Sequence, residues 1–162
     1  MTNDEIIEDV ILKEGGATAT NDPLDPGGRT QYGLSERANP SVWLDGKVTR
    51  EEALGVYLAK YVVQPGFDQV ENEPLRHLLV DFGVLSGPGM AIKALQRALG
   101  LKADGILGPD TLSKLKAAPD ARRLHNQVVI ERCLSLAKLV QAKPSQARFI
   151  VGWLNRSLSF IR

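Results

Sequence analysis

Lys13-Glu14-Gly15-Gly16 is the stretch at which a helical pattern gives way to a series of turns. Upstream of it, Thr2 and Glu5 have the spacing of a capping box, and four apolar residues follow at helical spacing. A pair of glycines is typical of the end of a helix. The sequence therefore predicts a helix that begins near Thr2 and ends directly after Glu14.

Glu14 lies on the apolar stripe of this predicted helix, three residues after Ile11, four after Val10 and seven after Ile7. Burial among apolar side chains and the dipole at a helix C-terminus both disfavour an ionised carboxylate. A general acid in glycoside hydrolysis must keep its proton near neutral pH. Glu14 is therefore a candidate catalytic acid, and the alternative is a surface glutamate in the last helical turn.

The segment 17–33 loses the helical pattern and is rich in turn-forming residues. These residues are Asn21-Asp22-Pro23, Asp25-Pro26-Gly27-Gly28 and Tyr32-Gly33. We expect a tight loop or a short hairpin here, folding back to place Asp22 or Asp25 and the Thr30 hydroxyl opposite Glu14, with a water molecule between them. Each aspartate alone is also explained as a turn former.

The charge of the chain is unevenly distributed. The net charge of the 162 residues is +1, but residues 1–89 hold 15 acidic and 7 basic residues, against 4 acidic and 13 basic in residues 90–162. This asymmetry indicates either that the C-terminal half contacts an anionic polymer or membrane, or that the two halves neutralise each other. The pattern does not predict a nucleic-acid partner.

Several classes of protein are disfavoured. Cys133 is the single cysteine and falls in an apolar helical run, so we expect an inert thiol and neither a disulfide nor a cysteine endopeptidase. The two histidines form no His-Glu-x-x-His motif, which argues against a zinc peptidase, and we expect no metal and no cofactor. The acidic N-terminus lacks the pattern of a signal peptide, and no apolar run suits a membrane span.

The rest of the sequence predicts further helices. One follows the capping-box spacing of Thr49 and Glu52, and the others cover residues 74–85, 90–99, 109–117, 119–140 and 144–161. The fold class is therefore mainly α, with a small β-hairpin or irregular loop after the first helix. We expect residues 1–89 and 90–162 to form two segments of one globule.

Two stretches of the N-terminal half carry a family resemblance. Glu14-Gly15-Gly16 and the run from Asn21 through Asp25-Pro26-Gly27-Gly28 to Thr30-Gln31-Tyr32-Gly33-Leu34 closely resemble the signature of glycoside hydrolase family 108 muramidases. The resemblance implies a lysozyme-like helical fold and assigns the essential glutamate to Glu14. Ala17 stands where the family usually has tyrosine, and we interpret this as a change in the lining of the glycan groove.

The same signature is similar to phage-type lysozymes, in which a Glu, an Asp and a Thr surround the catalytic water. Alignment on Thr30 and Gly33 places Asp25 nearest to that aspartate, although the spacing from Glu14 is longer here. The resemblance thus implies Asp25 as the second carboxylate, with Asp22 as the alternative, and Thr30 as the residue that holds water. Asp22, Gln31 and Tyr32 are the expected substrate contacts, and a structural role for Tyr32 is the alternative.

The C-terminal half resembles the peptidoglycan-binding module that usually follows the family 108 segment. The matching residues are Leu95-Gln96, Asp104-Gly105, Gly108, Thr111 and the ending Gly152-Trp153-Leu154-Asn155-Arg156. We expect Asp104 and Thr111 to support the fold rather than to contact sugar. The last helix combines arginines with apolar residues, which is typical of a core helix and also of a helix that contacts an anionic outer membrane.

Together these features predict a monomeric lysozyme that hydrolyses the β-1,4 bond between N-acetylmuramic acid and N-acetylglucosamine. Peptidoglycan glycan strands are the expected partner, and Glu14, Asp25 and Thr30 the expected catalytic residues. The alternatives are a lytic transglycosylase and a wall-binding protein without activity. The small size, the lack of a signal-peptide pattern and the wall-hydrolase resemblance together predict a phage endolysin that stays in the host cytoplasm until a holin releases it to the periplasm. A bacterial wall-remodelling enzyme with its own export route is the alternative.

Overall fold

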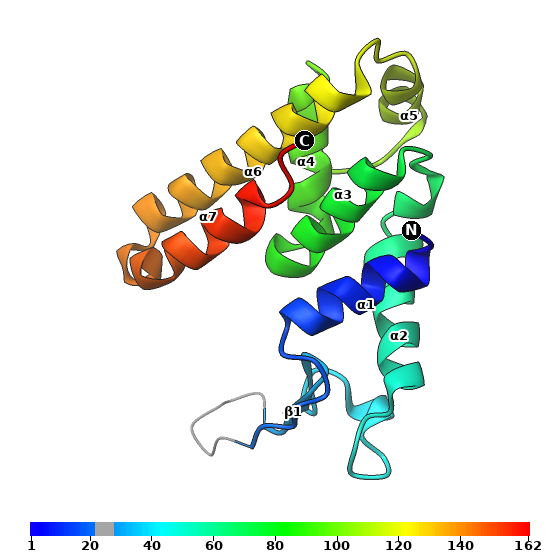
Figure 1. The fold of residues 1–162 in the computed structure, drawn as a ribbon, viewed down its shortest axis with the longest axis vertical. Helices are drawn as coiled ribbons and strands as arrows, with labels where there is room; N and C mark the ends of the chain where they lie inside the picture. The colour runs from blue at the N-terminus through cyan, green and yellow to red at the C-terminus, as the bar shows by residue number, and fades with distance from the viewer. Residues whose placement is uncertain (22–27) are drawn as a thin grey trace. The chain divides into compact units, whose positions relative to one another are not determined.

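The computed structural model describes residues 1–21 and 28–162 and divides into two units, Met1–Gln64 and Pro65–Arg162. Its described residues form seven α-helices and one two-stranded antiparallel sheet (Figure 1). This architecture confirms the predicted fold class, a mainly α lysozyme-like fold with a small hairpin after the first helix.

The first unit begins with helix α1, Asn3–Lys13, and both ends of this helix follow the sequence prediction. The Glu5 amide donates to the Thr2 hydroxyl at 3.2 Å, and the Thr2 amide donates to the Glu5 carboxylate at 2.6 Å. This reciprocal capping satisfies two amide groups that the helix itself leaves free. The apolar stripe of α1, including Val10, is buried.

Helix α2, Arg50–Leu58, is capped in the same way by Thr49 and Glu52. A π-helical turn, η2 (Ala59–Val63), continues it. Between α1 and α2 lie strands β1 (Thr30–Gln31) and β2 (Leu34–Ser35) and the 3-10 turn η1, Pro40–Val42. Helices α1 and α2 contact each other and enclose the core of this unit.

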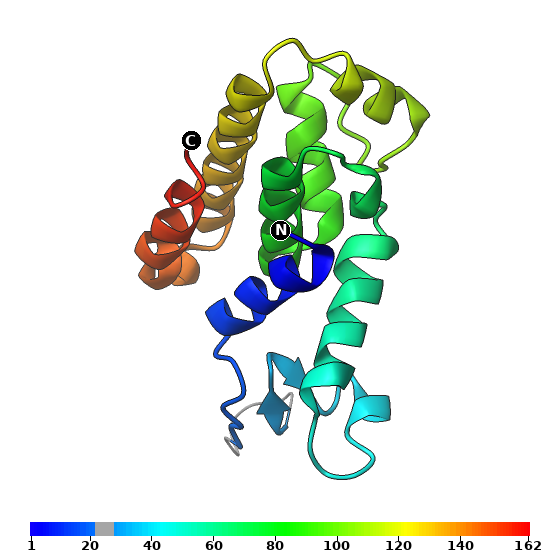
Figure 2. The same cartoon turned by 45° about the vertical axis from the view of Figure 1, so that its right-hand side comes forward.

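The second unit is built on α3, Glu73–Ser86, whose residues from Leu78 to Gly83 are all buried. The 3-10 turn η3 (Phe67–Gln69) precedes it, and α4 (Pro88–Ala98) and α5 (Pro109–Lys116) follow. Helix α6, Ala121–Ala142, contacts α3, α4 and α7, and it runs beside α7 in the views of Figures 1 and 2.

The C-terminal segment differs from the prediction of one helix over residues 144–161. Residues Pro144–Phe149 form a 3-10 helix, η4, and only Ile150–Leu158 form the α-helix α7. The Lys143 amide donates to the carbonyl of Leu139 and closes α6, and the chain then reverses direction through η4. Proline suits a helix start, but nothing in its pattern distinguishes a 3-10 turn from an α-helix.

One buried carboxylate holds three helices of the second unit together. Asp81 of α3 forms an ion pair with Arg132 of α6 at 2.7 Å and with Arg156 of α7 at 3.1 Å. The side chains of Asp81 and Arg132 are fully buried, and the Arg132 guanidinium also lies 5.3 Å from the ring centre of Phe82. Burial lowers the pKa of Arg132, and the contact with Asp81 opposes that shift.

Among the described residues, no helix is both long and apolar enough to cross a membrane.

Replacement of Asp81 by asparagine is expected to destabilise the second unit by roughly 3–5 kcal/mol, because two guanidinium groups lose their buried counter-charge. Urea unfolding followed by circular dichroism measures this change. Asp68→Asn is the control, since Asp68 is exposed and its replacement is expected to change the free energy of unfolding by about 0.5 kcal/mol or less. Equal stability of the two variants would contradict a structural role for the Asp81 cluster.

Candidate active site

Glu14 is the C-cap residue of α1, and the two glycines that follow it form the helix end. Gly15 and Gly16 have φ values of 106° and 60°, which are strained for any residue with a Cβ atom. The Gly16 amide donates to the Ile11 carbonyl at 2.9 Å and the Gly15 amide to the Leu12 carbonyl at 3.3 Å. This is the Schellman pattern. It ends the helix directly after Glu14 and leaves that side chain half-buried at the end of the apolar stripe.

The hairpin after α1 turns through Tyr32 and Gly33. Gln31 pairs with Leu34, and the two residues between them have φ values of 52° and 73°. Positive φ at both central positions is the property of a type I′ turn, whose twist suits a two-residue hairpin. Thr30 pairs with Ser35 on one side, and on the other it exchanges two backbone hydrogen bonds of 2.8 and 2.9 Å with Thr20. The structure therefore confirms the predicted hairpin.

The turn of this hairpin lies against Glu14. A Cβ atom added to Gly33 would lie 3.2 Å from the Cβ of Glu14 and 2.4 Å from the hydroxyl of Tyr57. The Tyr57 hydroxyl donates to the carbonyl of Tyr32 at 3.1 Å. Only a glycine allows this approach, because the turn backbone touches a helix end on one side and a buried phenol on the other. Glu14 is thus held between α1 and the hairpin.

Tyr57 was not predicted as a site residue. Its side chain is 3% exposed, and its ring lies 5.5 Å from that of Tyr61. In the sequence it stands on the apolar face of the helix after Thr49, where a tyrosine indicates core packing. The hydrogen bond to the Tyr32 carbonyl spans 25 residues, so no local pattern could reveal that Tyr57 positions the turn beside Glu14.

Gln31 connects the hairpin to the segments on either side. Its Oε1 accepts from the Val48 amide at 2.9 Å, and its Nε2 donates to the Ala17 carbonyl at 3.4 Å. These contacts fix the β1 strand relative to the chain that leaves α1 and the chain that enters α2. Whether Gln31 also contacts sugar stays a prediction.

Arg29 fastens the outer side of the hairpin. It donates two hydrogen bonds to Glu36, of 2.9 and 2.8 Å, and one of 3.0 Å to the Gly46 carbonyl. Its guanidinium lies 4.9 Å from the ring centre of Trp43, whose indole donates to the Leu34 carbonyl. The hydrogen bonds from Arg29 lower the pKa of Glu36. Glu36 is therefore a structural partner of Arg29.

The predicted site residues have different outcomes. The structure brings Glu14 next to the turn formed by Tyr32 and Gly33, and it places Thr30 in the strand that leads into this turn. Asp22 and Asp25 lie outside the described residues, so the choice of a second carboxylate stays a prediction. Among the residues that the structure describes, no group of three or more His, Cys, Asp or Glu side chains could hold a metal ion.

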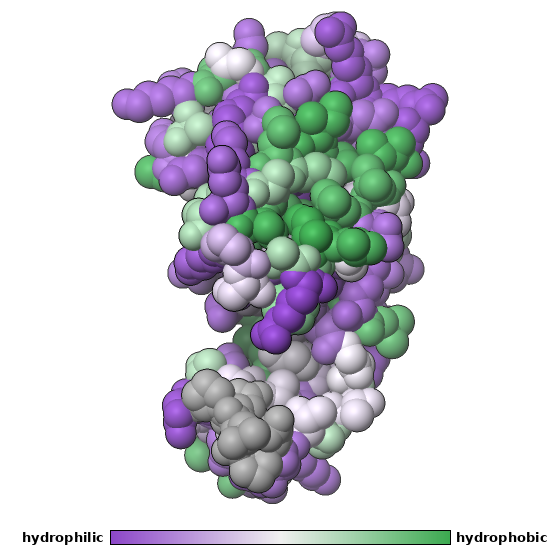
Figure 3. All heavy atoms as spheres, turned by 90° about the vertical axis from the view of Figure 1, so that its left-hand side faces the viewer, coloured by the Kyte–Doolittle hydropathy of each residue, from purple (hydrophilic) through white to green (hydrophobic). Residues whose placement is uncertain are grey.

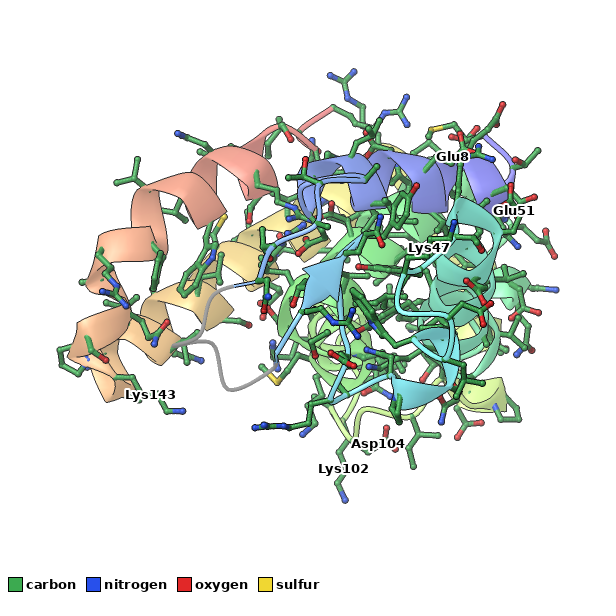
Figure 4. The ribbon with its side chains drawn as sticks, turned by 90° about the horizontal axis from the view of Figure 1, so that it is seen from below. Glu8, Lys47, Glu51, Lys102, Asp104 and Lys143 are labelled. Atoms are coloured by element: carbon green, nitrogen blue, oxygen red, sulfur yellow. The ribbon has the colours of Figure 1, made fainter. Side chains whose placement is uncertain are left out.

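The second unit contains a hydrogen-bonded loop at the motif residues predicted there. The buried Nε2 of Gln96 donates to Asp104 at 2.7 Å, to the Ile106 carbonyl at 3.0 Å and to the Thr111 hydroxyl at 3.2 Å. Its Oε1 accepts from the Gly105 amide at 2.9 Å. The bond from Gln96 holds the pKa of Asp104 below its usual value. Asp104 itself lies in the loop that joins α4 to α5 (Figure 4).

This network explains the spacing of the motif. The side-chain amide of Gln96 forms hydrogen bonds with both the loop and the start of α5. A buried amide group without hydrogen-bond partners would lower the stability of the fold. These contacts support the expectation that Asp104 and Thr111 serve the fold, and none of them requires a sugar.

Comparison with known proteins agrees with this geometry. The family described as Glycosyl hydrolase 108 matches residues 7–87, which is half of the 162 residues. The chain belongs to this family. A second family, described as Predicted Peptidoglycan domain, matches residues 90–158.

This glycosyl hydrolase 108 protein is also similar to a solved structure, that of Brucella abortus SagA. The two sequences are 28% identical, and the structures superpose with a TM-score of 0.70 over 99% of this chain and 96% of that chain. Among curated proteins, none matches it.

The family membership makes this protein a lysozyme-like glycoside hydrolase that acts on peptidoglycan. The two family matches meet near the predicted boundary between residues 1–89 and 90–162, whereas the compact units divide after Gln64. The division into these two segments within one globule stays a prediction.

Replacement of Gly33 by alanine is expected to reduce hydrolysis of peptidoglycan roughly 10- to 100-fold, because the new Cβ pushes the turn away from Glu14 and Tyr57. The strained φ adds a loss of stability of about 1–2 kcal/mol. Turbidity clearing of purified sacculi measures the activity, and thermal unfolding measures the stability.

Gly55→Ala is the matched control, because an added Cβ at Gly55 in α2 meets no atom within 4 Å. This variant is expected to keep full activity and to gain up to about 1 kcal/mol of stability. If Gly33→Ala behaves like Gly55→Ala, the close approach of the turn to Glu14 has no role in the reaction.

Proposed function

We propose that this protein is an N-acetylmuramidase, which hydrolyses the β-1,4 bond between N-acetylmuramic acid and N-acetylglucosamine with Glu14 as general acid. The observation that carries the proposal is the contact between the Gly33 turn and the Glu14 side chain. The helix end and the turn meet at the base of the Glu14 side chain, and general acid catalysis requires a positioned proton donor.

The reaction assigns a separate task to each group. The Glu14 carboxyl donates its proton to the glycosidic oxygen as the bond from that oxygen to the anomeric carbon of N-acetylmuramic acid breaks. A water molecule then adds to the anomeric carbon and gives up a proton, so that the products are two sugar hydroxyl groups. The Glu14 carboxylate regains a proton before the next cycle.

The water needs its own partners, and we propose Thr30 and a second carboxylate for this role. Among the described residues, none forms a hydrogen bond with the Thr30 hydroxyl, while the backbone of Thr30 is paired with Thr20 and Ser35. That pairing fixes the backbone from which the Thr30 side chain extends. Asp25 is the proposed second carboxylate and Asp22 the alternative, as the resemblance to phage-type lysozymes implies.

The matched variants Glu14→Gln and Glu51→Gln test the proposal. Both remove one carboxylate from the first unit, but Glu51 lies exposed in the first turn of α2. We expect Glu14→Gln to slow the release of glycan fragments from purified Gram-negative sacculi by about 100-fold or more, because general acid catalysis contributes that much. Glu51→Gln is expected to keep the wild-type rate, and circular dichroism checks that both variants are folded.

Mass spectrometry of the released fragments identifies the reaction. Hydrolysis by a muramidase leaves reducing N-acetylmuramic acid ends. Anhydromuramic ends would instead identify a lytic transglycosylase and contradict the role of water. Unchanged clearing by Glu14→Gln would remove Glu14 as the catalyst, and an inactive wild-type protein that still binds sacculi would identify a wall-binding protein.

A further inference from the structure

The last three elements of the chain carry a large excess of positive charge. Residues 121–162 contain eight basic residues and one acidic residue, Glu131, which is paired with Arg97 of α4 at 2.5 Å. Two of the eight, Arg132 and Arg156, point inward to Asp81. The other six are exposed: Arg122, Arg123, Lys138, Lys143, Arg148 and Arg162. Among the described residues, no carboxylate forms an ion pair with the side chain of any of these six.

The same elements expose apolar side chains at regular helical spacing. On α6, Ile130 and Leu134 are 46% and 49% exposed and four residues apart. On α7, Val151 and Leu158 are 67% and 53% exposed and seven residues apart, with Leu154 between them. We call these five residues the α6–α7 patch. Large apolar side chains at such regular spacing on a surface are expected at an interaction site.

Hydrogen bonds fasten the end of the chain to α6, so that α6 and α7 pack side by side. The chain end after α7 returns to the first half of α6, where Asn126 exchanges hydrogen bonds of 2.8 and 3.0 Å with the backbone of Arg162. His125 bonds to the Phe160 carbonyl at 2.7 Å. Figure 3 faces the side on which α6 and α7 lie in Figure 1, and it shows apolar side chains gathered in one area with hydrophilic side chains around it.

Three of the six exposed cations lie at or near the turn between α6 and α7. Lys143 points outward at this turn (Figure 4), and Lys138 lies one helical turn before it. Arg148 lies 4.6 Å from the ring centre of Phe149, which is 43% exposed. A surface that combines aliphatic side chains, one exposed aromatic ring and cations has the chemistry of a helix lying at the boundary between lipid headgroups and acyl chains.

Charge and side-chain type favour a lipid surface over a second copy of the chain or a glycan. A second copy of the chain would place the unpaired cations of both copies opposite each other, which is repulsive. A glycan would be bound by polar groups and aromatic faces, whereas the patch is aliphatic. Anionic phospholipids supply both the negative charge and the apolar layer, and each Lys or Arg near such a surface strengthens binding.

We propose that the α6–α7 patch binds the surface of anionic phospholipid bilayers, in addition to the action of the protein on peptidoglycan. The patch contains none of the residues proposed for catalysis. Membrane binding and hydrolysis of isolated sacculi are therefore separable by mutation.

The test uses the full chain and sedimentation with vesicles of phosphatidylglycerol and phosphatidylethanolamine, compared with vesicles of phosphatidylcholine alone. We expect binding to the anionic vesicles only, weakened by salt because charges near the surface are screened. The variant Lys138→Gln/Lys143→Gln/Arg148→Gln is expected to bind at least roughly 30-fold more weakly. Its control, Lys47→Gln/Lys102→Gln/Lys114→Gln, removes three exposed lysines elsewhere and is expected to bind as the wild type does.

A second pair of variants tests the apolar part. Val151→Ser/Leu158→Ser is expected to lose binding to anionic vesicles, whereas Leu44→Ser/Val63→Ser, at exposed apolar positions of the first unit, is expected to keep it. All four variants should hydrolyse lipid-free sacculi at the wild-type rate.

Four results would overturn the proposal. In the sedimentation assay, the wild type could fail to bind anionic vesicles, it could bind both kinds of vesicle equally, or each variant could bind as well as its control. In the activity assay, the patch variants could lose hydrolysis of sacculi. Sedimentation equilibrium adds a fifth: a dimer of the wild type that Val151→Ser/Leu158→Ser dissociates would assign the patch to a second copy of the chain. The proposal can fail in each of these ways while Glu14 remains the catalyst.

Discussion

The contact of the Gly33 backbone with Glu14 and Tyr57 is the constraint on which the first unit depends. It requires a helix that ends directly after Glu14, a turn with two positive φ values, and a buried phenol that holds the turn through the Tyr32 carbonyl. Each of these features is costly or unusual alone. Together they bring the base of the Glu14 side chain against the turn of the hairpin, and this arrangement accounts for the glycines on both sides of it.

The second unit depends on polar groups buried among apolar ones. Asp81 holds α3, α6 and α7 together through two arginines, and Gln96 holds the loop between α4 and α5. Separating Asp81 from its arginines would leave buried charges without a counter-charge, so the ion pairs favour one arrangement of the helices. The residues that match the peptidoglycan domain thus include a structural framework, and the exposed surface of α6 and α7 carries the patch for which we propose lipid binding.

The sequence predicted the features that depend on neighbouring residues. Both capping boxes, the helix end at Gly15-Gly16 and the turn at Tyr32-Gly33 were predictable, because short motifs with known backbone geometry encode them. The roles of Tyr57 and Arg29 were not predictable, because no local motif encodes contacts with residues 25 positions away for Tyr57 and 7 and 17 positions away for Arg29. The 3-10 helix at residues 144–149 was missed for a different reason, since its proline signals a start without specifying the kind of helix.

The central claim is that Glu14 protonates the glycosidic oxygen of a peptidoglycan strand. A crystal structure of the Glu14→Gln variant with a bound tetrasaccharide of alternating N-acetylglucosamine and N-acetylmuramic acid tests it most directly. The claim predicts that the oxygen linking N-acetylmuramic acid to the next N-acetylglucosamine lies about 2.6–3.2 Å from the side chain of residue 14. A glycan bound with no glycosidic oxygen within hydrogen-bonding reach of residue 14, directly or through one water, would contradict it.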